Sequence, residues 1–496
     1  MREMSTDILV VGAGNAALCA ALSASGAGLE VMVVESADRE NRGGNTAFTG
    51  GVFRHWHNGK DDIMRLVDDL NDNEWNQIDV SPFKPEALYN EVMHVTSGKA
   101  DPDLTRTWVY SSRETIFWMK DNLGIKFTFN DVFTLKDLGI KKYAGPAVLM
   151  TEGKGKGLSD SLFRICENRN DISIIYETAM HKLLVSENKV EGIECLTGGE
   201  KTTIMAKAVI LAGGGFEASR EMRKKLMGPE WESAKVRGSR HNTGEPLFSA
   251  IEAGCAKSGD FSDAHCTPID ARSPDFGDPK LTDKTARYSW MYGILVNLHG
   301  KRFVDEGEDL GGVVYAKLGK IILRQQGSTA VQIFDRKSKN LLEKRYSTME
   351  PQFIGKVTDV ATGMGIPTDE LVNTIRNYNS ACSDEYGKFK PGELDGLSTR
   401  DIIPPKSNWA TPISLDDVIA YAVTGGITFT FGGLRVSTKA EVMGKEDKPV
   451  NGLYAAGEIT GGFFFGNYPV GSGLMRGSVF GRIAGNESKK YVKKIN

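Results

Sequence analysis

The clearest pattern of apolar and polar positions lies in the first 35 residues of the chain. Residues 8–11 are four consecutive apolar residues, a glycine-rich turn follows at 12–17, residues 16–25 are small and mostly apolar, and residues 30–35 form a second apolar run bounded by glutamates. Short unbroken apolar runs are typical of buried parallel strands, and the small residues between them favour a closely packed helix. The segment therefore predicts one βαβ unit.

The turn of this unit has a sequence suited to the pyrophosphate of a dinucleotide. Gly12 permits a tight turn, Gly14 lets the backbone approach a phosphate, and Ala17 allows close packing of helix on strand. The N-terminus of the helix adds N–H donors and a partial positive charge. Glu35 ends the second strand, where a carboxylate can accept a hydrogen bond from a ribose hydroxyl. We therefore predict a bound dinucleotide.

Further glycine-rich segments indicate which dinucleotide is bound. A second glycine loop at 42–51 lies too close to the first to begin another nucleotide site, and the apolar run 208–211 ends in glycines. Near the C-terminus the run 452–458 repeats that pattern before a predicted helix at 471–484. Glycine turns from both chain ends around one nucleotide fold suit FAD better than NAD. The predicted FAD contacts are Gly12, Gly14, Asn15, Ala16, Ala17, Glu35, Ser36, Gly43, Gly44, Asn45, Thr46, Gly50, Gly51, Ala212, Gly213, Gly214, Gly457, Glu458, Ser472, Gly473 and Leu474.

The middle of the chain has a different pattern. From 236 to 405 the buried-strand runs give way to mixed polar segments, with helix-like stretches near 314–325 and 368–382. We predict an α/β protein in which a discontinuous Rossmann-like FAD-binding domain, residues 1–235 and 406–496, is interrupted by an inserted α+β capping domain, residues 236–405. A cap over a flavin would exclude water from the reacting carbons.

Composition argues against several other classes of protein. The 496 residues carry 61 basic and 64 acidic side chains, a net charge of −3, which disfavours a nucleic-acid or acidic-membrane partner. The sequence has no stretch that approaches the ~18 consecutive apolar residues of a membrane helix. The first residues lead directly into the first strand, so we expect a cytoplasmic protein without membrane insertion. The six cysteines are scattered without a CxxC motif, and we expect no metal site.

Several motifs in order along the chain resemble one flavoprotein family. Besides the βαβ unit they are the segments 43–46, 211–216, 242–245, 293–297, 300–306, 431–434, 455–458 and 480–485. Over almost the whole length they are similar to the fumarate reductases, succinate dehydrogenases and 3-ketosteroid dehydrogenases. The resemblance implies a bilobal fold, FAD, and hydride transfer between flavin N5 and one carbon of a C–C bond. Asn45 stands about where the membrane complexes carry a flavin-linking histidine, which implies noncovalent FAD.

The residues with which the family reduces fumarate are mostly missing. The family's proton-donating arginine would fall within Glu308-Asp309-Leu310, and Ala286-Arg287 replaces a threonine-glutamate pair. His265 alone resembles the family's substrate histidine. Fumarate reduction is therefore disfavoured by the resemblance.

Two other branches of the family fit better. The segments 302–307, 315–319 and 421–433 look like tricarballylate dehydrogenase, which desaturates a propane tricarboxylate. Tyr468-Pro469 resembles the turn of 3-ketosteroid dehydrogenases whose tyrosine binds the ketone oxygen. The first resemblance is more extensive and therefore leads.

The chemistry implied by the family indicates candidate site residues. The carbon that loses or gains a proton must be acidified by a carboxylate or carbonyl, so the site needs cations or hydrogen-bond donors. Arg54, on a turn expected to face the flavin, can bind a carboxylate with bidentate geometry. Tyr468 can donate to a carbonyl or carboxylate oxygen, and His265 can contact the substrate. A surface loop, a packed aromatic ring and a structural histidine are the respective alternatives. The predicted catalytic residues are Tyr468, Arg54 and His265, and the predicted substrate contacts are Arg54, His57, His265, Tyr292, Thr428, Tyr468 and Gly473.

Three functions remain open from the sequence. The leading hypothesis is an FAD-dependent dehydrogenase that desaturates a small carboxylic acid similar to tricarballylate, with a separate iron–sulfur or quinone-linked electron acceptor if the resemblance extends that far. The second is a 3-ketosteroid or enone dehydrogenase or reductase. The third is a flavin-binding electron-transfer or sensor subunit without turnover of its own.

Overall fold

The computed structural model describes residues 2–130, 134–137, 140–143, 145–281, 283–444 and 446–496. The contacts within the chain divide it into two units. Unit 1 comprises Met1–Met222, Gly238–Ala264 and Phe429–Asn496, and unit 2 comprises Arg223–Arg237 and His265–Thr428. The domain limits at 235/236 and 405/406 stay predictions.

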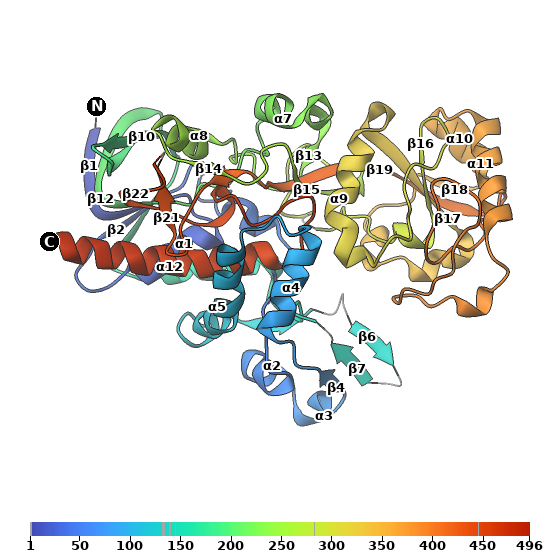
Figure 1. The fold of residues 1–496 in the computed structure, drawn as a ribbon, viewed down its shortest axis with the longest axis horizontal. Helices are drawn as coiled ribbons and strands as arrows, with labels where there is room; N and C mark the ends of the chain where they lie inside the picture. The colour runs from blue at the N-terminus through green and yellow to red at the C-terminus, as the bar shows by residue number, and fades with distance from the viewer. Residues whose placement is uncertain (1, 131–133, 138–139, 144, 282, 445) are drawn as a thin grey trace. The chain divides into compact units, whose positions relative to one another are not determined.

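Unit 1 is built on an eight-stranded sheet (Figure 1). Its central strand pairs in parallel with a neighbour on each side, so that Ile8 lies opposite both Ala208 and Val31. The strand order is β10 (Thr178–Ser186), β11 (Lys189–Thr197), β22 (Pro449–Ala455), β12 (Glu200–Leu211), β1 (Arg2–Val11), β2 (Val31–Val34) and β9 (Ile172–Ile175), with β21 (Glu441–Met443) paired to β22. Segments from both chain ends therefore meet in one sheet.

The predicted βαβ unit is present. β1 ends at Val11, α1 covers Asn15–Ala24, and β2 covers Val31–Val34. Nine of the ten residues of α1, all except Ala16, are buried, because small side chains let the helix lie between the sheet and a second helix. Each predicted boundary is matched within a few residues, apart from the polar start of β1.

The second helix is α12 (Ser472–Ile495), which packs along α1. Gly481 and Gly485 make this approach possible, because a Cβ at either position would lie within 2.3 Å of a carbonyl oxygen of α1. The helix extends well past the predicted end at residue 484. Val492 is buried, and Lys489 donates to the Ser25 carbonyl at 2.9 Å. One face of the helix therefore stays packed in its lysine-rich last turns.

The remaining elements of unit 1 are smaller sheets and helices around this core. The small sheets contain β3 (Val52–Phe53), β8 (Leu149–Thr151), β5 (Phe127–Phe129), β4 (Ile78–Val80), β7 (Ile140–Tyr143), β6 (Thr134–Asp137), β14 (Lys257–Ser258) and β20 (Gly433–Leu434). The helices are α2 (Lys60–Leu66), α3 (Asp72–Trp75), α4 (Pro85–Val95), α5 (Pro102–Asp121), α6 (Lys154–Glu167) and α8 (Glu245–Glu252), with 3₁₀ turns η1 (Gly44–Phe48) and η9 (Gly457–Ile459). α7 (Arg220–Met227) spans the division between the units.

Unit 2 has its own mixed sheet, with a core in which Val331, Ile375 and Ala420 are fully buried. Its strands are β13 (Lys235–Val236), β15 (Ala264–Asp270), β16 (Ile294–Asn297), β17 (Thr329–Asp335), β18 (Phe353–Gly355) and β19 (Val418–Thr430). Its helices are α9 (Gly311–Leu323), α10 (Val357–Met364) and α11 (Thr368–Ala381), with 3₁₀ turns η3 (Pro229–Ser233), η4 (Trp290–Tyr292), η5 (Gln326–Ser328), η6 (Arg336–Leu341), η7 (Lys344–Ser347) and η8 (Tyr386–Lys388). The predicted α/β class, with a Rossmann-like sheet and a second mixed-sheet region, is confirmed.

Candidate functional site

The glycine turn after β1 has the shape of a phosphate-binding loop. Gly12 has a φ of +99°, and a Cβ there would lie 2.5 Å from the Ala212 carbonyl oxygen, so this position requires glycine. Gly14 is the N-cap of α1 and offers no side-chain cap. The Asn15 N–H donates to the Thr46 hydroxyl at 2.8 Å, which attaches the second glycine loop to the first. The helix N-terminus is thus directed at the space that a pyrophosphate needs.

Glu35 follows β2 and is 4% exposed. Its carboxylate accepts the Ala37 N–H at 2.9 Å and the Ser36 hydroxyl at 3.3 Å. Burial raises the pKa of this carboxyl, and the hydrogen bonds from the neighbouring backbone oppose that shift. Its position at the end of the second strand fits the ribose of an adenosine half.

The start of α12 lies against the same turns. Asn15 donates to the Leu474 carbonyl at 2.9 Å and to the Ser478 hydroxyl at 2.9 Å, which ties α1 to α12. The Ser472 hydroxyl is fully buried, and within the described part of the chain it has no hydrogen-bond partner. A buried hydroxyl without a partner is costly unless a ligand satisfies it. The residues present therefore fit FAD. We call residues 12–17, 43–46, 212–214 and 472–474 the glycine cradle.

Two buried glutamates lie next to Asn45 of the cradle. The Asn45 amide donates to Glu217 at 2.6 Å and to Glu458 at 3.4 Å, Asn242 donates to Glu217 at 2.7 Å, and the Thr430 N–H donates to Glu458 at 2.8 Å. Burial raises the pKa of both carboxyls, and their mutual repulsion raises that of Glu458 further. Both carboxyls therefore hold a proton more strongly than an exposed glutamate does.

Arg54 lies just after β3 and is 6% exposed. Its Nη1 donates to the Val470 carbonyl at 2.8 Å, and its backbone N–H donates to the Gly471 carbonyl at 3.2 Å. Its Nη2 forms an ion pair with Glu91 of α4. Arg54 is thus fixed beside the turn that precedes α12, rather than exposed on a surface loop.

Tyr468 belongs to that same turn and is 7% exposed. Its phenol oxygen accepts the Gly473 N–H at 2.6 Å, which brings together two predicted site residues. Burial raises the pKa of Tyr468 to about 12, against the opposing effects of the Gly473 hydrogen bond and the Arg476 and Arg54 charges. The phenol is therefore protonated at neutral pH.

His57 lies apart from these contacts. Its Nε2 is 3.2 Å from the Gly145 carbonyl, and its Nδ1 accepts the Gly59 N–H at 3.2 Å. Burial lowers its pKa, as it does for His55, whose ring packs on it with the ring centroids 5.7 Å apart. Backbone groups contact both ring nitrogens in this structure, and the substrate contact of His57 stays a prediction.

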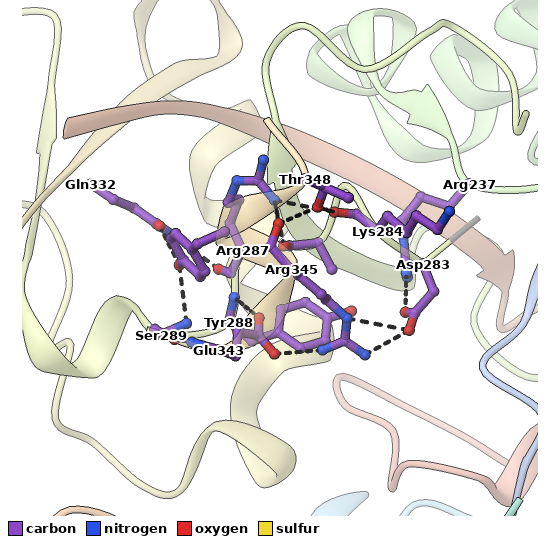
Figure 2. Close-up of polar contacts among 12 residues, drawn as sticks. Arg237, Asp283, Lys284, Arg287, Tyr288, Ser289, Gln332, Glu343, Arg345 and Thr348 are labelled. Atoms are coloured by element: carbon purple, nitrogen blue, oxygen red, sulfur yellow. Dashed lines mark hydrogen bonds and ion pairs between the residues drawn. The ribbon is translucent and has the colours of Figure 1, made fainter. Parts of the chain in front are cut away.

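In unit 2 the predicted contact Thr428 is hydrogen-bonded to Arg237, which belongs to a network of charged residues (Figure 2). Arg237 donates to the Thr428 hydroxyl at 3.0 Å and pairs with Asp283 at 3.3 Å. Arg345 pairs with Asp283 at 2.7 Å and with Glu343 at 2.6 Å. Figure 2 shows Arg237 and Arg345 directed at the same carboxylate. The network therefore has two cations and two anions.

His265 lies near this network and is 2% exposed. Its ring packs edge-on against Tyr315 at 4.9 Å, and Tyr315 in turn lies 5.2 Å from Tyr288. Burial, with a smaller contribution from the Arg237 charge, lowers the pKa of His265 to about 3. The ring is therefore neutral at physiological pH, and it can contact a substrate as a hydrogen-bonding group but not as a cation.

Tyr292 lies elsewhere in unit 2. Its ring packs against Trp409 at 6.1 Å and Phe389 at 6.4 Å. Among the contacts of the described residues, none joins it to Arg237 or His265. The structure thus brings Arg54, Tyr468 and Gly473 together in unit 1 and Thr428 and Arg237 together in unit 2, but it leaves Tyr292 outside both groups.

Sequence reasoning missed several charged residues of these groups. Glu217, Asp283, Arg345 and Arg476 occur in no recognisable spacing with the residues that they contact. Glu217 follows the glycines at the end of β12, and this was the one available signal. The others become neighbours through long-range folding.

Within the described residues, no helix is long and apolar enough to cross a membrane. The same residues contain no group of three or more histidine, cysteine, aspartate or glutamate side chains placed to hold a metal ion.

The chain is similar to several flavin enzymes over almost its whole length. It is 27% identical to a fumarate reductase (cytochrome) of Shewanella frigidimarina over 99% of this chain and 78% of that protein. It is 28% identical to an NADH:acrylate oxidoreductase of Vibrio harveyi over 99% of this chain, but it spans only 51% of that protein.

Solved structures show the same fold. An open conformation of a flavocytochrome c3 fumarate reductase matches with a TM-score of 0.73 at 25% identity, over 99% of this chain and 79% of that chain. The 3-ketosteroid-Δ4-(5α)-dehydrogenase of Rhodococcus jostii matches with a TM-score of 0.71 at 23% identity, over 99% and 98%.

A family model described as FAD binding domain matches residues 7–474, which include the cradle and all of unit 2. The predicted relationship to the fumarate reductase flavoproteins is confirmed at this level, and the specific relationship to tricarballylate dehydrogenase stays a prediction. The chain belongs to the FAD-binding domain family and is an FAD-dependent oxidoreductase.

Proposed function

We propose that this oxidoreductase acts on CH–CH groups, forming or reducing a C–C double bond next to the carboxylate of a small organic acid. The observation that carries the proposal is the placement of Tyr468. Its protonated phenol is anchored through its oxygen to Gly473, in the cradle itself. Relatives named for fumarate and acrylate support a carboxylate beside the double bond.

The reaction needs an acidified carbon and a hydride carrier. Bound FAD supplies the hydride chemistry, and the protein supplies orientation and electrostatics. Tyr468 is proposed to donate a hydrogen bond to the oxygen that gains negative charge when the neighbouring carbon loses its proton, because preformed donors stabilise such charge best. Arg54 is proposed to stabilise the same charge, while its ion pair with Glu91 holds it in place.

The remaining predicted contacts enter the proposal in two groups. The cofactor contacts are the cradle residues with Glu35, Ser36, Gly50, Gly51, Gly457 and Glu458. FAD is proposed to be noncovalent, because the Asn45 amide has no nucleophilic ring nitrogen and its donors are directed at Glu217 and Glu458. His265 and Thr428 are proposed as polar substrate contacts of unit 2, and Gly473 as a backbone contact of unit 1.

Tricarballylate is the first substrate to test, and a separate protein or quinone-linked partner is proposed to take the electrons. A 3-ketosteroid or enone is the second candidate, favoured by the aromatic rings around the phenol. The ring of Tyr468 lies 4.9 Å from Phe429 and 5.0 Å from Phe464, centroid to centroid. Such a surface suits an apolar ketone.

The test is anaerobic stopped-flow absorbance of the purified yellow protein. Tricarballylate is expected to bleach the oxidised flavin, and acrylate is expected to reoxidise flavin reduced beforehand with dithionite. The Tyr468→Phe variant is expected to retain flavin and to lose roughly 10²- to 10³-fold in the bleaching rate, as for removal of one oxyanion donor. Bleaching by 3-ketosteroids alone would favour the second candidate, and bleaching by neither class would refute the proposal in favour of a non-catalytic flavoprotein.

A further inference from the structure

Arg476 is a buried cation in unit 1 that the proposed function does not use. It lies in the first turns of α12 and is 3% exposed. Burying a guanidinium is costly unless its donors are hydrogen-bonded and its charge is balanced. The contacts of Arg476 show how many of its donors are hydrogen-bonded and whether its charge is balanced.

One nitrogen of the guanidinium is held by the protein. Nη1 donates to the Thr460 carbonyl at 3.1 Å and lies 3.3 Å from the Thr460 hydroxyl. That hydroxyl donates to the Gly457 carbonyl at 2.7 Å, which fixes the threonine. The arginine therefore has a defined orientation.

The other two nitrogens form an open fork. Nε is fully buried and has no hydrogen-bond partner within the described residues, and Nη2 forms no hydrogen bond or ion pair with any of them. In an arginine, the Nε–H and one Nη2–H point in the same direction, which is the side-on edge that binds a planar carboxylate through two parallel hydrogen bonds. The edge tied to Thr460 is the opposite one.

The charge of Arg476 is not balanced by a nearby carboxylate either. Burial lowers its pKa to about 10, with Tyr468 and Glu458 opposing, so it remains a cation at neutral pH. Glu458 is the acid that faces it, but the pKa of Glu458 is raised well above its usual value by burial and by Glu217. The raised pKa favours the neutral form of Glu458 and so weakens it as a counter-ion for the guanidinium.

The surroundings of the fork are aromatic. The guanidinium carbon lies 4.4 Å from the ring centroid of Phe463 and 5.3 Å from that of Phe464, and the Phe464 ring packs on Tyr468. Aromatic walls exclude water, and a charged hydrogen bond is stronger where water is excluded. The groups next to the charge are therefore apolar rings.

We infer that the Nε and Nη2 edge of Arg476 binds the carboxylate of the substrate, beside Tyr468, and that the substrate carries apolar or unsaturated carbons next to that carboxylate. The inference deepens the proposed function and rests on it. Arg476 would be a specificity-determining residue that selects an anionic substrate over a neutral ketone.

The probe is benzoate, an unreactive carboxylate with an apolar ring, and its neutral isostere benzamide. Binding is followed by the change in the visible absorbance of the bound flavin during titration. Arg476→Met is expected to weaken benzoate binding by roughly 10- to 100-fold, as for loss of hydrogen bonds to a charged group. The benzoate affinity of Arg476→Lys is expected to lie between those of wild type and Arg476→Met, because an ammonium group is charged but cannot form two parallel hydrogen bonds. Benzamide binding is expected to change less than threefold.

The matched control is Arg482→Met, on the same helix, where the arginine pairs with Glu114 at 2.8 Å. It is expected to leave benzoate binding unchanged. In the wild-type protein, benzoate and not benzamide is expected to protect Arg476 from phenylglyoxal, with modification mapped by mass spectrometry, and this measurement needs no variant to fold.

Three results would overturn the inference: equal benzoate affinity in wild type and Arg476→Met, loss of flavin from both Arg476 variants with no protection by benzoate, or equal protection by benzamide. The second would indicate that the fork holds the cofactor. Failure of the proposed function is a separate result, because it appears as absence of bleaching by any carboxylic acid while benzoate binding is intact.

Discussion

The ion pairs of unit 2 differ from the charged groups around Asn45 and Arg476 in unit 1. In unit 2, Asp270 pairs with Arg287 and Arg272 at 2.9 Å each, and Asp283 pairs with Arg237 and Arg345. Beside the glycine cradle of unit 1, two acidic residues, Glu217 and Glu458, both accept hydrogen bonds from the Asn45 amide. The Nε of Arg476 has no hydrogen-bond partner among the described residues.

The difference indicates where a ligand is needed. Paired charges hold segments of a fold in register, and removing one partner leaves the other uncompensated. Charges that are unbalanced within the protein lower its stability and are typical of binding sites. We therefore expect the ion pairs of unit 2 to stabilise the fold and the cradle of unit 1 to bind a ligand. The following variants test each of these two roles.

The largest effect is expected from a methyl group in the cradle. In Gly12→Ala, the new Cβ would overlap the Ala212 carbonyl oxygen, and alanine disfavours the positive φ of this turn. Moving the loop to relieve a strain of ~3 kcal/mol is expected to weaken FAD binding on the order of 100-fold. The measurement is the flavin-to-protein absorbance ratio after dialysis, with the far-UV circular dichroism unchanged.

Gly26→Ala provides the matched control. Gly26 has a φ of +90°, close to that of Gly12, but a Cβ there has no atom within 4 Å. The control is expected to lose stability on the order of 1 kcal/mol or somewhat more through the strained φ and to keep its flavin. Equal flavin loss in the two variants would show that backbone strain, and not the shape of the cradle, determines FAD binding.

The next effect tests unit 2. Asp283→Asn removes the carboxylate shared by Arg237 and Arg345, whose side chains are 13% and 19% exposed. Leaving two largely buried guanidinium groups without that partner is expected to lower the free energy of unfolding by about 2–4 kcal/mol. Urea denaturation monitored by tryptophan fluorescence measures this change.

Asp447→Asn is the control for that variant, because Asp447 also pairs with an arginine but is 68% exposed. Its effect is expected to stay below ~0.5 kcal/mol, since water screens the pair. If Asp283→Asn were as stable as this control while its flavin chemistry was lost, the network would be part of the active site and the proposed division of roles would be wrong.

The fold was predictable where the pattern of apolar residues in the sequence matches the burial of the same residues in the folded protein. The runs 8–11 and 31–34 are apolar because both faces of their strands are buried, and Gly12 is required by a positive φ that a sequence motif records. The end of α12 was not predictable in this way. Its last turns contain four lysines, yet one face remains packed, as Val492 and Lys489 show.

The candidate site was predictable only in part, for a related reason. Tyr468 lies five residues from its partner Gly473, and a turn motif can record such a contact. Asn45 and Glu458 are 413 positions apart, and Arg345 and Asp283 are 62 apart, so only the folded chain brings them together. The backbone contacts of His57 were likewise not predictable, because they leave no trace in the local sequence.

The smallest expected effect concerns how the stability of the protein changes with pH because of the buried carboxyls Glu217 and Glu458. Both carboxyls have pKa values raised above the ordinary 4.5, so between about pH 4.5 and those higher values the folded state holds protons that the unfolded state has released. Folding stability must therefore fall as pH rises through this window.

Glu458→Gln removes one of the two acids, keeps the side-chain shape, and leaves Glu217 beside a neutral amide near the Arg476 charge. The variant is expected to be more stable than wild type at pH 8 by about 1–2 kcal/mol and to equal it near pH 5. Chemical denaturation at the two pH values, with Glu446→Gln as an exposed control, measures the difference. Parallel pH profiles for wild type and Glu458→Gln would mean that the pair holds no extra proton, and the guanidinium of Arg476 would then have a counter-ion within the protein.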